Sequence, residues 1–140
     1  MTSLNSYLTF NGNCREAMTF YAACLVGQLT FQTIDELPMA ENMPTQMKEH
    51  IFNSTLINDD IIIMASDMVS ENGLTKGNAV TLLLNCSSEE EIKICYEKLS
   101  VGGEVNHSLE NTFSGAIFGD LTDKYGINWM LNYTRKTRNN

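Results

Sequence analysis

Few side chains in this sequence are of the types that bind metals or transfer protons. The chain has two histidines, His50 and His107. His50 lies at the start of a predicted strand and His107 lies in the polar stretch EVNHSLE, so both are expected at the surface rather than at a metal centre. We therefore favour no metal or other cofactor. The alternative is a divalent-metal site that forms only if folding brings His50, Asp67 or Glu104 together.

Nucleophilic catalysis has no stronger candidate. The four cysteines show no C-x-x-C spacing, which predicts reduced and partly buried thiols at Cys14, Cys24, Cys86 and Cys95. Cys14 falls in the first turn of a predicted helix, where the helix dipole could lower a thiol pKa, but its place in an apolar stripe predicts burial. The sequence contains no G-x-S-x-G, phosphate-binding loop or H-E-x-x-H motif.

Composition argues against several classes of partner. The chain has 140 residues, 43% of them hydrophobic and 19% charged, which is enough to bury the core of one globular domain. A net charge of −8 argues against nucleic-acid binding. No apolar run reaches the roughly 18 residues that a membrane span needs. The stretch MTSLNSYLTF lacks the features of a signal peptide, so we expect a cytoplasmic protein.

The first half of the chain predicts one helix among four strands. The helix follows Asn13, a good N-cap with Glu16 three residues on, and ends at Gly27. Residues 36–49 read as a proline-containing loop that would suit a lid or a swapped contact. The strands are expected at residues 4–10, 28–35, 50–57 and 60–67.

The second half predicts the same order of elements. Ser87 or Ser88 is the N-cap of a helix that Gly102 ends, and three glutamates after the cap suit the positive end of the helix dipole. The strands are expected at residues 78–86, 104–110, 115–122 and 127–133.

Two β-α-β-β-β units in succession indicate an internal repeat, the alternative being coincidence within an ordinary α+β domain. A shift of the first helix by 75 residues aligns Glu16 with Glu91, Tyr21 with Tyr96, Val26 with Val101 and Gly27 with Gly102. Because one helix protects only one face of a short sheet, the two units are expected to close around their bare faces as half-barrels with a central cleft. We predict an α+β fold in a single domain over 1–140, with repeat one at about 4–67, a loop at 68–77, repeat two at 78–134 and a basic tail at 135–140.

Several stretches resemble the vicinal oxygen chelate superfamily, which includes glyoxalase I, extradiol dioxygenases and the bleomycin- and fosfomycin-resistance proteins. Within it, YLTFNGNCREAMTFY, MASD, VGGEV and FGDLTDKYGINWM are similar to the PhnB-like branch, which begins with F-N-G-N-x-x-E-A-x-x-F-Y and ends with D-x-F-G-x-x-W-M. The resemblance covers residues 4–133 and implies a homodimer whose subunits complete each other's clefts. The branch is often labelled a demethylubiquinone methyltransferase, but no glycine-rich nucleotide loop follows the first strand.

The resemblance also implies where a metal would be held. Members usually bind a divalent ion through two inward side chains from each half, commonly His and Glu. Here the carboxylate positions fall on Met64 and Met130, and the first-strand positions fall near Ser6 and Thr81. Thioethers are poor ligands for hard or borderline ions. Asn53 stands where branch members often carry another histidine, so the resemblance implies the fold without its usual metal centre.

We predict a cleft that binds a small apolar or aromatic molecule, because methionine and aromatic side chains adapt to flat ligands and amides orient them. Ser114, where relatives often have a tryptophan, would widen this cleft. One alternative is that these residues form the plain core of filled barrels. The other is a divalent-metal-dependent lyase, isomerase or dioxygenase with atypical ligands. The predicted cleft residues are Asn53, Met64, Phe113, Asn128 and Met130, with Trp129 or its neighbours beside them.

Overall fold

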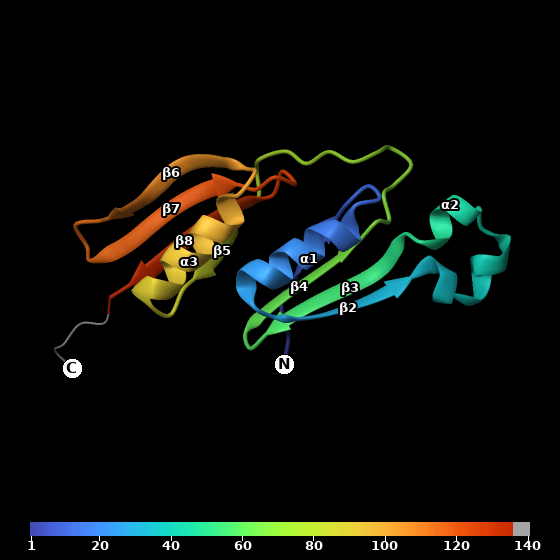
Figure 1. The fold of residues 1–140 in the computed structure, drawn as a ribbon, viewed down its shortest axis with the longest axis horizontal. Coiled ribbons are helices and arrows are strands. Elements are labelled where there is room, and N and C mark those ends of the chain that lie inside the picture. The colour runs from blue at the N-terminus through green and yellow to red at the C-terminus, as the bar shows by residue number, and fades with distance from the viewer. Residues whose placement is uncertain (136–140) are drawn as a thin grey trace. The chain divides into compact units, whose positions relative to one another are not determined.

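The chain folds into two compact units with the same order of elements (Figure 1). A computed structural model describes residues 1–135, and the units divide after Thr75, inside the loop predicted at 68–77. Each unit contains one long helix and four strands. The predicted α+β fold with a tandem β-α-β-β-β repeat is therefore confirmed. Of the basic tail predicted at 135–140, all but Arg135 lies outside the described residues.

The first unit is a four-stranded sheet with a helix on one face. Its strands lie in the order β1-β4-β3-β2, with β1 parallel to β4 and the other neighbours antiparallel. A parallel pair requires a crossover connection, and the helix belongs to the chain segment that makes it. The bounds are β1 (Ser6–Thr9), α1 (Cys14–Leu25), β2 (Gln28–Thr33), β3 (Ile51–Asn58) and β4 (Ile61–Ser66).

The second unit repeats this topology. Its strands lie in the order β5-β8-β7-β6, again with the first strand parallel to the last. Its helix, like α1, is 12 residues long, and no helix within residues 1–135 is long and apolar enough to cross a membrane. The bounds are β5 (Leu82–Asn85), α3 (Glu89–Ser100), β6 (Glu104–Asn111), β7 (Ala116–Thr122) and β8 (Asn128–Thr134).

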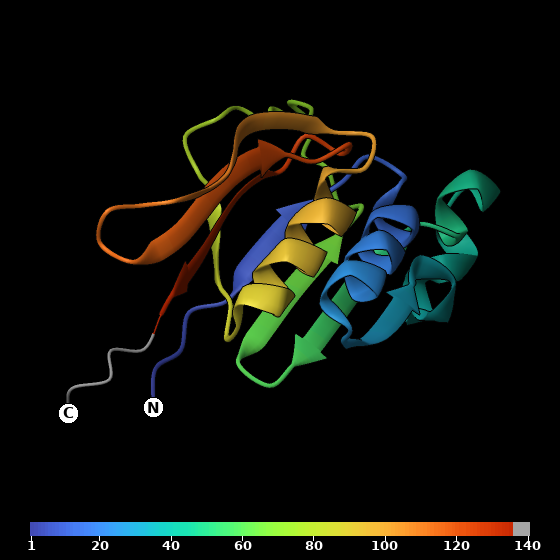
Figure 2. The same cartoon turned by 60° about the vertical axis from the view of Figure 1, so that its left-hand side comes forward.

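The segment between β2 and β3, expected to be a loop, contains three short helices that extend from the ends of these strands (Figure 2). Each is about one turn held by local bonds, such as the one from the Leu37 N–H to the Ile34 carbonyl at 2.9 Å. Turns this short carry no apolar periodicity for a sequence to reveal. Ile34 and Ala40 are buried and anchor the segment. The helices are η1 (Ile34–Glu36), η2 (Pro38–Asn42) and α2 (Thr45–Lys48).

Both ends of α1 differ from the prediction. Asn13 occupies the N-cap position, but its side chain makes no capping bond. The first N–H of the helix instead donates to the carboxylate of Asp67 at 2.9 Å. At the other end Val26, not Gly27, takes the left-handed conformation, with φ of 55°. Gly27 is required for close packing, because a Cβ there would lie 2.7 Å from Leu56 Cδ1.

The start of α3 confirms the prediction and decides between the two serines. The Ser88 hydroxyl accepts a bond from the Glu91 N–H at 3.0 Å. The Glu91 carboxylate in turn accepts a bond from the Ser87 N–H at 2.9 Å. Two N–H groups at the start of α3 thus bond to side chains that are at most four residues away in the sequence.

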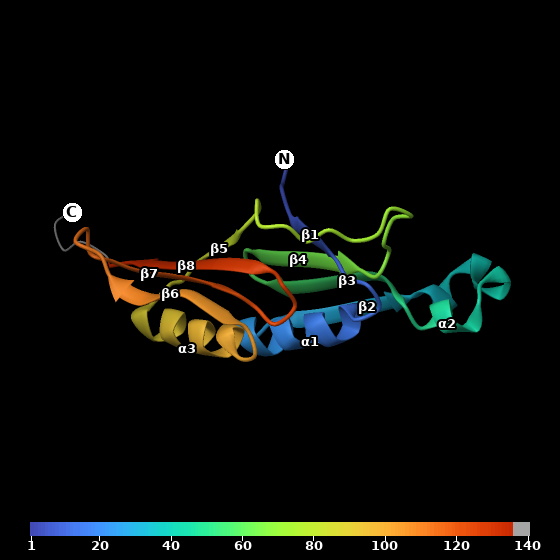
Figure 3. The same ribbon diagram turned by 90° about the horizontal axis from the view of Figure 1, so that it is seen from above.

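Each helix covers one face of its own sheet and leaves the other face without a helix (Figure 3). Alternate side chains of a strand point to opposite faces, and burial follows this alternation. On β4, Ala65 is buried whereas Met64 is half-buried. On β8, Leu131 is buried whereas Met130 is half-buried. We call the helix-free side the open face of each sheet.

The two helix starts give a matched test of capping. We expect Ser88→Ala to lower the free energy of unfolding by about 1 kcal/mol, because the Glu91 N–H loses its acceptor. Asn13→Ala should cost less than about 0.5 kcal/mol, because the Asn13 side chain caps nothing. Urea denaturation of both variants measures the difference. Equal losses would contradict the assignment of the α1 cap to Asp67.

Candidate functional site

The open face of the first sheet carries one row of side chains drawn from all four strands. The register places Tyr7 of β1 and Thr55 of β3 beside Met64 of β4, and Thr30 of β2 beside Thr55. Asn53 is two residues from Thr55 on β3 and therefore shares this face. The structure thus brings Asn53 and Met64, both predicted for the cleft, to the same open face.

The open face of the second sheet carries a corresponding row. The register places Leu83 of β5 and Asp120 of β7 beside Met130 of β8, and His107 of β6 beside Asp120. Asn128 is two residues from Met130 and shares the face. Asn128 and Met130, the predicted cleft residues of this unit's sheet, therefore also lie together.

The remaining predicted cleft residues lie elsewhere. Phe113 is fully exposed in the turn between β6 and β7. Trp129 lies on the helix-covered face, where it is 2% exposed and its indole N–H donates to Asp123 at 2.8 Å. Of the predicted alternatives, Trp129 or its neighbours, only the neighbours Asn128 and Met130 lie on the open face.

The side chains at the implied metal positions do not fit a metal. Tyr7 lies beside Met64 and Leu83 lies beside Met130. A phenol, an alkyl group and two thioethers are poor ligands for the hard or borderline ions of glyoxalase-like chemistry. Residues 1–135 contain no group of three or more His, Cys, Asp or Glu that could hold a metal ion. Tyr7 and Leu83 are one and two residues from Ser6 and Thr81, near which the first-strand positions were expected.

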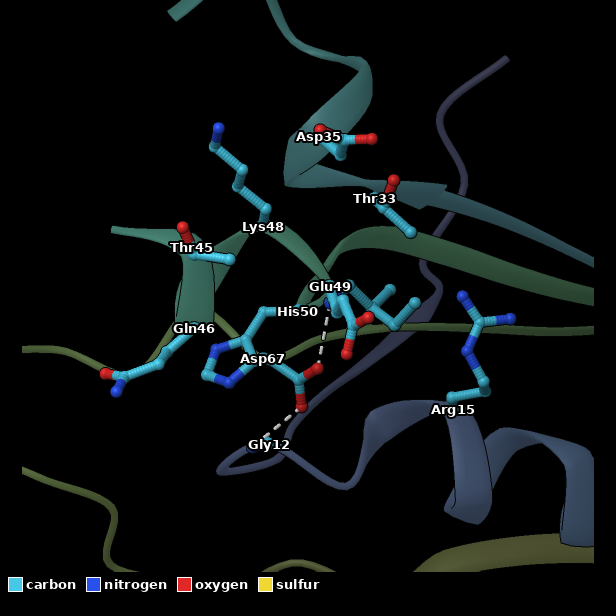
Figure 4. A pocket seen from close by; sticks show the side chains of 11 residues that line it. Gly12, Arg15, Thr33, Asp35, Thr45, Gln46, Lys48, Glu49, His50 and Asp67 are labelled. Carbon is cyan, nitrogen blue, oxygen red and sulfur yellow. Dashed lines mark hydrogen bonds between the residues drawn. The ribbon is translucent and has the colours of Figure 1, made fainter. Parts of the chain in front are cut away.

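A polar pocket of about 990 Å³ lies in the first unit, where α1 begins and the short helices join β2 and β3 (Figure 4). Arg15 reaches it from α1 and Lys48 from α2, and Asp35 and Glu49 add the opposite charge. Side chains of both signs give no preference for a cation or an anion. None of the predicted cleft residues lines this pocket.

Asp67, at the inner wall of this pocket, is a structural anchor. Its Oδ1 accepts bonds from the N–H groups of Gly12 and Cys14, and its Oδ2 accepts one from Ile51, each at 2.9 Å. The carboxylate therefore ties the α1 start to the β3 start and is already engaged by three donors. His50 lines the same pocket, but pairs with no acidic side chain among residues 1–135.

Cys14 is not an activated nucleophile. Burial, and secondarily the charge of Asp67, raise the pKa of its thiol to about 12. A thiolate is the reactive form of cysteine, so the raised pKa leaves the group inert near neutrality. The expected burial of Cys14 in the apolar stripe of α1 is confirmed.

A second buried carboxylate organises the turn before β8. Oδ1 of Asp123 accepts bonds from the N–H groups of Tyr125, at 2.8 Å, and Ile127, at 3.1 Å, while Oδ2 accepts the Trp129 indole N–H. Gly126 has φ of 85°, a conformation that favours glycine. Five residues of the stretch DKYGINWM therefore define one turn.

A family model described as 3-demethylubiquinone-9 3-methyltransferase matches residues 2–132. The protein YjdN of Escherichia coli strain K12 is 31% identical over 144 residues, which cover 95% of this chain and 96% of YjdN. The chain belongs to this family, the PhnB-like branch of the vicinal oxygen chelate superfamily.

Solved structures agree with the PhnB-like assignment. Protein PA1353 from Pseudomonas aeruginosa is 31% identical, with a TM-score of 0.85 over 97% of this chain and 100% of that chain. A putative 3-demethylubiquinone-9 3-methyltransferase, PhnB protein, from Bacillus cereus is 28% identical, with a TM-score of 0.74. The match covers 95% of this chain and 100% of that chain. A glyoxalase/bleomycin resistance protein/dioxygenase family enzyme from Burkholderia phytofirmans PsJN shares the fold at 14% identity and a TM-score of 0.61. This match covers 93% of this chain and 98% of that chain.

The two PhnB-like motifs are explained by the fold rather than by a reaction. In the opening stretch FNGN, Gly12 has φ of 90° and donates its N–H to Asp67. In the closing stretch, Asp123 and Trp129 bond to each other. These residues fix the start of α1 and the turn into β8, so the motifs report the PhnB-like architecture.

One candidate pair was missed from the sequence. His107 was expected at a solvated edge. Its Nδ1 atom lies 2.6 Å from Oδ1 of Asp120. The two residues are 13 apart on neighbouring strands of a hairpin. The sequence could have indicated this pair only through the alternation of side chains between the two faces of each strand. Two shifts in the register of β6 obscure that alternation.

The anchoring role of Asp67 is tested by a change that keeps its shape. Asp67→Asn should lower the free energy of unfolding by about 1–3 kcal/mol, because one of three backbone N–H groups would then face an NH2 group. Asp35→Asn, an exposed change at the same pocket, should stay within about 0.5 kcal/mol of the parent. Thermal and urea unfolding measure both. Similar stability of the two variants would contradict the anchoring role.

Proposed function

We propose that this PhnB-like protein binds a small apolar or aromatic molecule on the open faces of its sheets, without a standard metal centre. One observation carries the proposal: corresponding rows place Tyr7 beside Met64 in one unit and Leu83 beside Met130 in the other. Adaptable apolar side chains stand where the superfamily usually places imidazole and carboxylate ligands. Such side chains favour contact with a flat apolar molecule over activation of a substrate oxygen.

The exposure of these rows supports a binding surface. Tyr7 is 54% exposed and Leu83 is 55% exposed, on faces that no helix of the same unit covers. Apolar side chains gathered on one face mark ligand or partner sites more often than scattered ones do. Asn53 and Asn128 border the two rows and would supply amide groups that orient a ligand.

The same surfaces support a homodimer as part of the proposal. Each open face leaves apolar side chains accessible within its unit, Ile57 on β3 among them at 47% exposed. A second copy of the chain offers the same two faces, and a pairing between copies would cover them symmetrically. The subunits would then complete each other's clefts.

The alternative, a divalent-metal-dependent lyase, isomerase or dioxygenase with atypical ligands, is weaker. It requires that folding bring His50, Asp67 or Glu104 together. Asp67 is already engaged by three backbone N–H groups. The proposal therefore includes no metal cofactor.

Methyl transfer, which the description of the family model names, is not part of the proposal. Nucleotide-based donors bind at a glycine-rich turn between a strand and a helix of a parallel sheet. Here the connection from β1 to α1 is FNGN, and the N–H of Gly12 within it donates to Asp67. The proposed location is cytoplasmic, in keeping with four buried cysteines that form no disulfide.

Metal content separates the two functions directly. We expect protein purified without chelator or affinity tag to contain no stoichiometric metal in elemental analysis. Calorimetric titration with zinc, nickel, manganese and iron(II) should show no binding at micromolar concentrations, because residues 1–135 bring no three His, Cys, Asp or Glu side chains together and thioethers are poor ligands for these ions. One tightly held ion per chain, lost in His50→Gln or Glu104→Gln, would overturn the metal-free proposal.

Charged substitutions on the open faces test ligand binding, with the neutral dye Nile red as probe. Met64→Glu and Met130→Glu should each weaken its fluorescence-detected binding about tenfold, because a carboxylate must lose water when the dye covers it. Met39→Glu, the same change in η2 outside both sheets, is the matched control and should bind as the parent does.

Light scattering on these samples should give two chains per particle for the parent. Equal dye affinity in all three variants would contradict binding on the open faces. A parent that scatters as a single chain would contradict the homodimer.

A further inference from the structure

His107 lines a second pocket, of about 420 Å³, formed by the β6–β7 hairpin of the second unit. Its walls combine two aromatic side chains, Phe113 and Phe118, with the polar groups of His107 and Glu110. A pocket of this volume is within the usual range for small-molecule sites, and a mostly apolar lining with few polar groups is typical of them.

Asp120 sets the direction of the His107 ring. The 2.6 Å contact joins His107 Nδ1 to Asp120 Oδ1. An ionised carboxylate only accepts hydrogen bonds, so Nδ1 must carry the hydrogen. In the neutral ring this leaves Nε2 as a hydrogen-bond acceptor on the side away from Asp120. His50, the other histidine, has no carboxylate partner among residues 1–135.

The backbone on both sides of this contact is held by α3. The Tyr96 hydroxyl donates to the His107 carbonyl at 2.7 Å and lies 3.3 Å from the Asp120 carbonyl. Gly119 permits this approach, because a Cβ there would lie 2.9 Å from Tyr96 Cε2. The register of β6 shifts on both sides of His107, and such bulges redirect a side chain. The position of His107 is therefore defined by α3, β6 and β7 together.

Phe113 is presented by an ordered turn. The Thr112 N–H donates to the Ala116 carbonyl at 2.7 Å, and the Gly115 N–H donates to the Thr112 carbonyl at 3.1 Å. The turn holds Phe113 fully exposed at the pocket wall. The Phe113 ring is therefore accessible to a molecule that enters the pocket.

The charges at this pocket select against anions. Glu110 lines it directly and Asp120 lies behind His107. The Arg135 guanidinium donates to Asn111 of the lining, but it also pairs with Glu89 at 3.1 Å, which offsets its charge. A carboxylate or phosphate ligand would face like charges. A neutral ligand with a hydrogen-bond donor matches both the charges and the Nε2 acceptor.

We propose that this pocket binds a neutral aromatic molecule bearing a hydroxyl group, with the O–H donating to His107 Nε2 and the ring packing against Phe113 and Phe118. This inference rests on the proposed small-molecule function and narrows its ligand class. His107 is the binding residue, and Asp120 is a positioning residue that acts through the His107 ring.

The ring state is tested first, without any ligand. With two histidines in the chain, nitrogen-15 NMR of the imidazoles resolves each ring, and His50→Gln identifies the His107 signals. Under mildly alkaline conditions we expect His107 to carry its hydrogen on Nδ1. Asp120→Ala should shift the hydrogen toward Nε2, a change that a purely structural role for Asp120 would not produce. An Nε2–H tautomer in the parent would overturn the proposal.

Ligand choice is tested with three related probes: 2-naphthol, 2-methoxynaphthalene, which lacks the donor, and 2-naphthoate, which is an anion. Calorimetry should show 2-naphthol binding about three- to tenfold tighter than 2-methoxynaphthalene, as expected for one hydrogen bond, and 2-naphthoate binding weakest. His107→Leu should remove the preference for 2-naphthol, because a leucine side chain offers no hydrogen-bond acceptor, whereas His50→Leu should keep it.

The outcomes separate this inference from the proposed function. Equal binding of 2-naphthol and 2-methoxynaphthalene, unchanged in His107→Leu, would overturn the hydroxyl inference and leave small-molecule binding intact. Tightest binding of 2-naphthoate would overturn the charge argument and with it the ligand class. No binding of any probe, together with no binding of Nile red, would overturn both proposals.

Discussion

A single helix covers only one face of a four-stranded sheet, and this constraint shapes the whole protein. In each unit the helix buries alternate side chains of its sheet, such as Ala65 on β4 and Leu131 on β8. The intervening side chains, Met64 and Met130 among them, are left on the open face. Because the unit occurs twice with the same strand order, the chain has two such faces. The candidate binding surface thus follows from incomplete coverage of the sheets by helices.

Two buried carboxylates hold the connections around these sheets in place. Asp67 binds backbone N–H groups at the starts of α1 and β3, and Asp123 binds the turn before β8 together with the Trp129 indole. A buried carboxylate is stable only when its oxygens are satisfied, and both are. The residues that mark the PhnB-like branch most clearly are therefore the residues that keep its turns and helix starts in place.

Function must then reside in side chains that the fold does not require. Tyr7, Met64, Leu83 and Met130 make no bond that fixes a turn or a cap, yet they occupy the rows where the superfamily usually places metal ligands. A shared fold supports many activities, so the chemistry of these positions carries more information than the family name. In the second unit, His107 and Asp120 add an oriented acceptor to the open face.

The sequence by itself determined the features that depend on neighbours along the chain. The apolar stripe of α1, a serine cap at Ser87 or Ser88 and the order of strands and helices were readable because periodicity and capping act over a few residues. Only the tertiary structure decided which residue caps α1, since Asp67 acts from 53 residues away, and which face receives Trp129. The same holds for the meeting of His107 with Asp120, which two register shifts in β6 obscure. These contacts depend on strand order and register, which are set by packing between distant segments and leave no local pattern in the sequence.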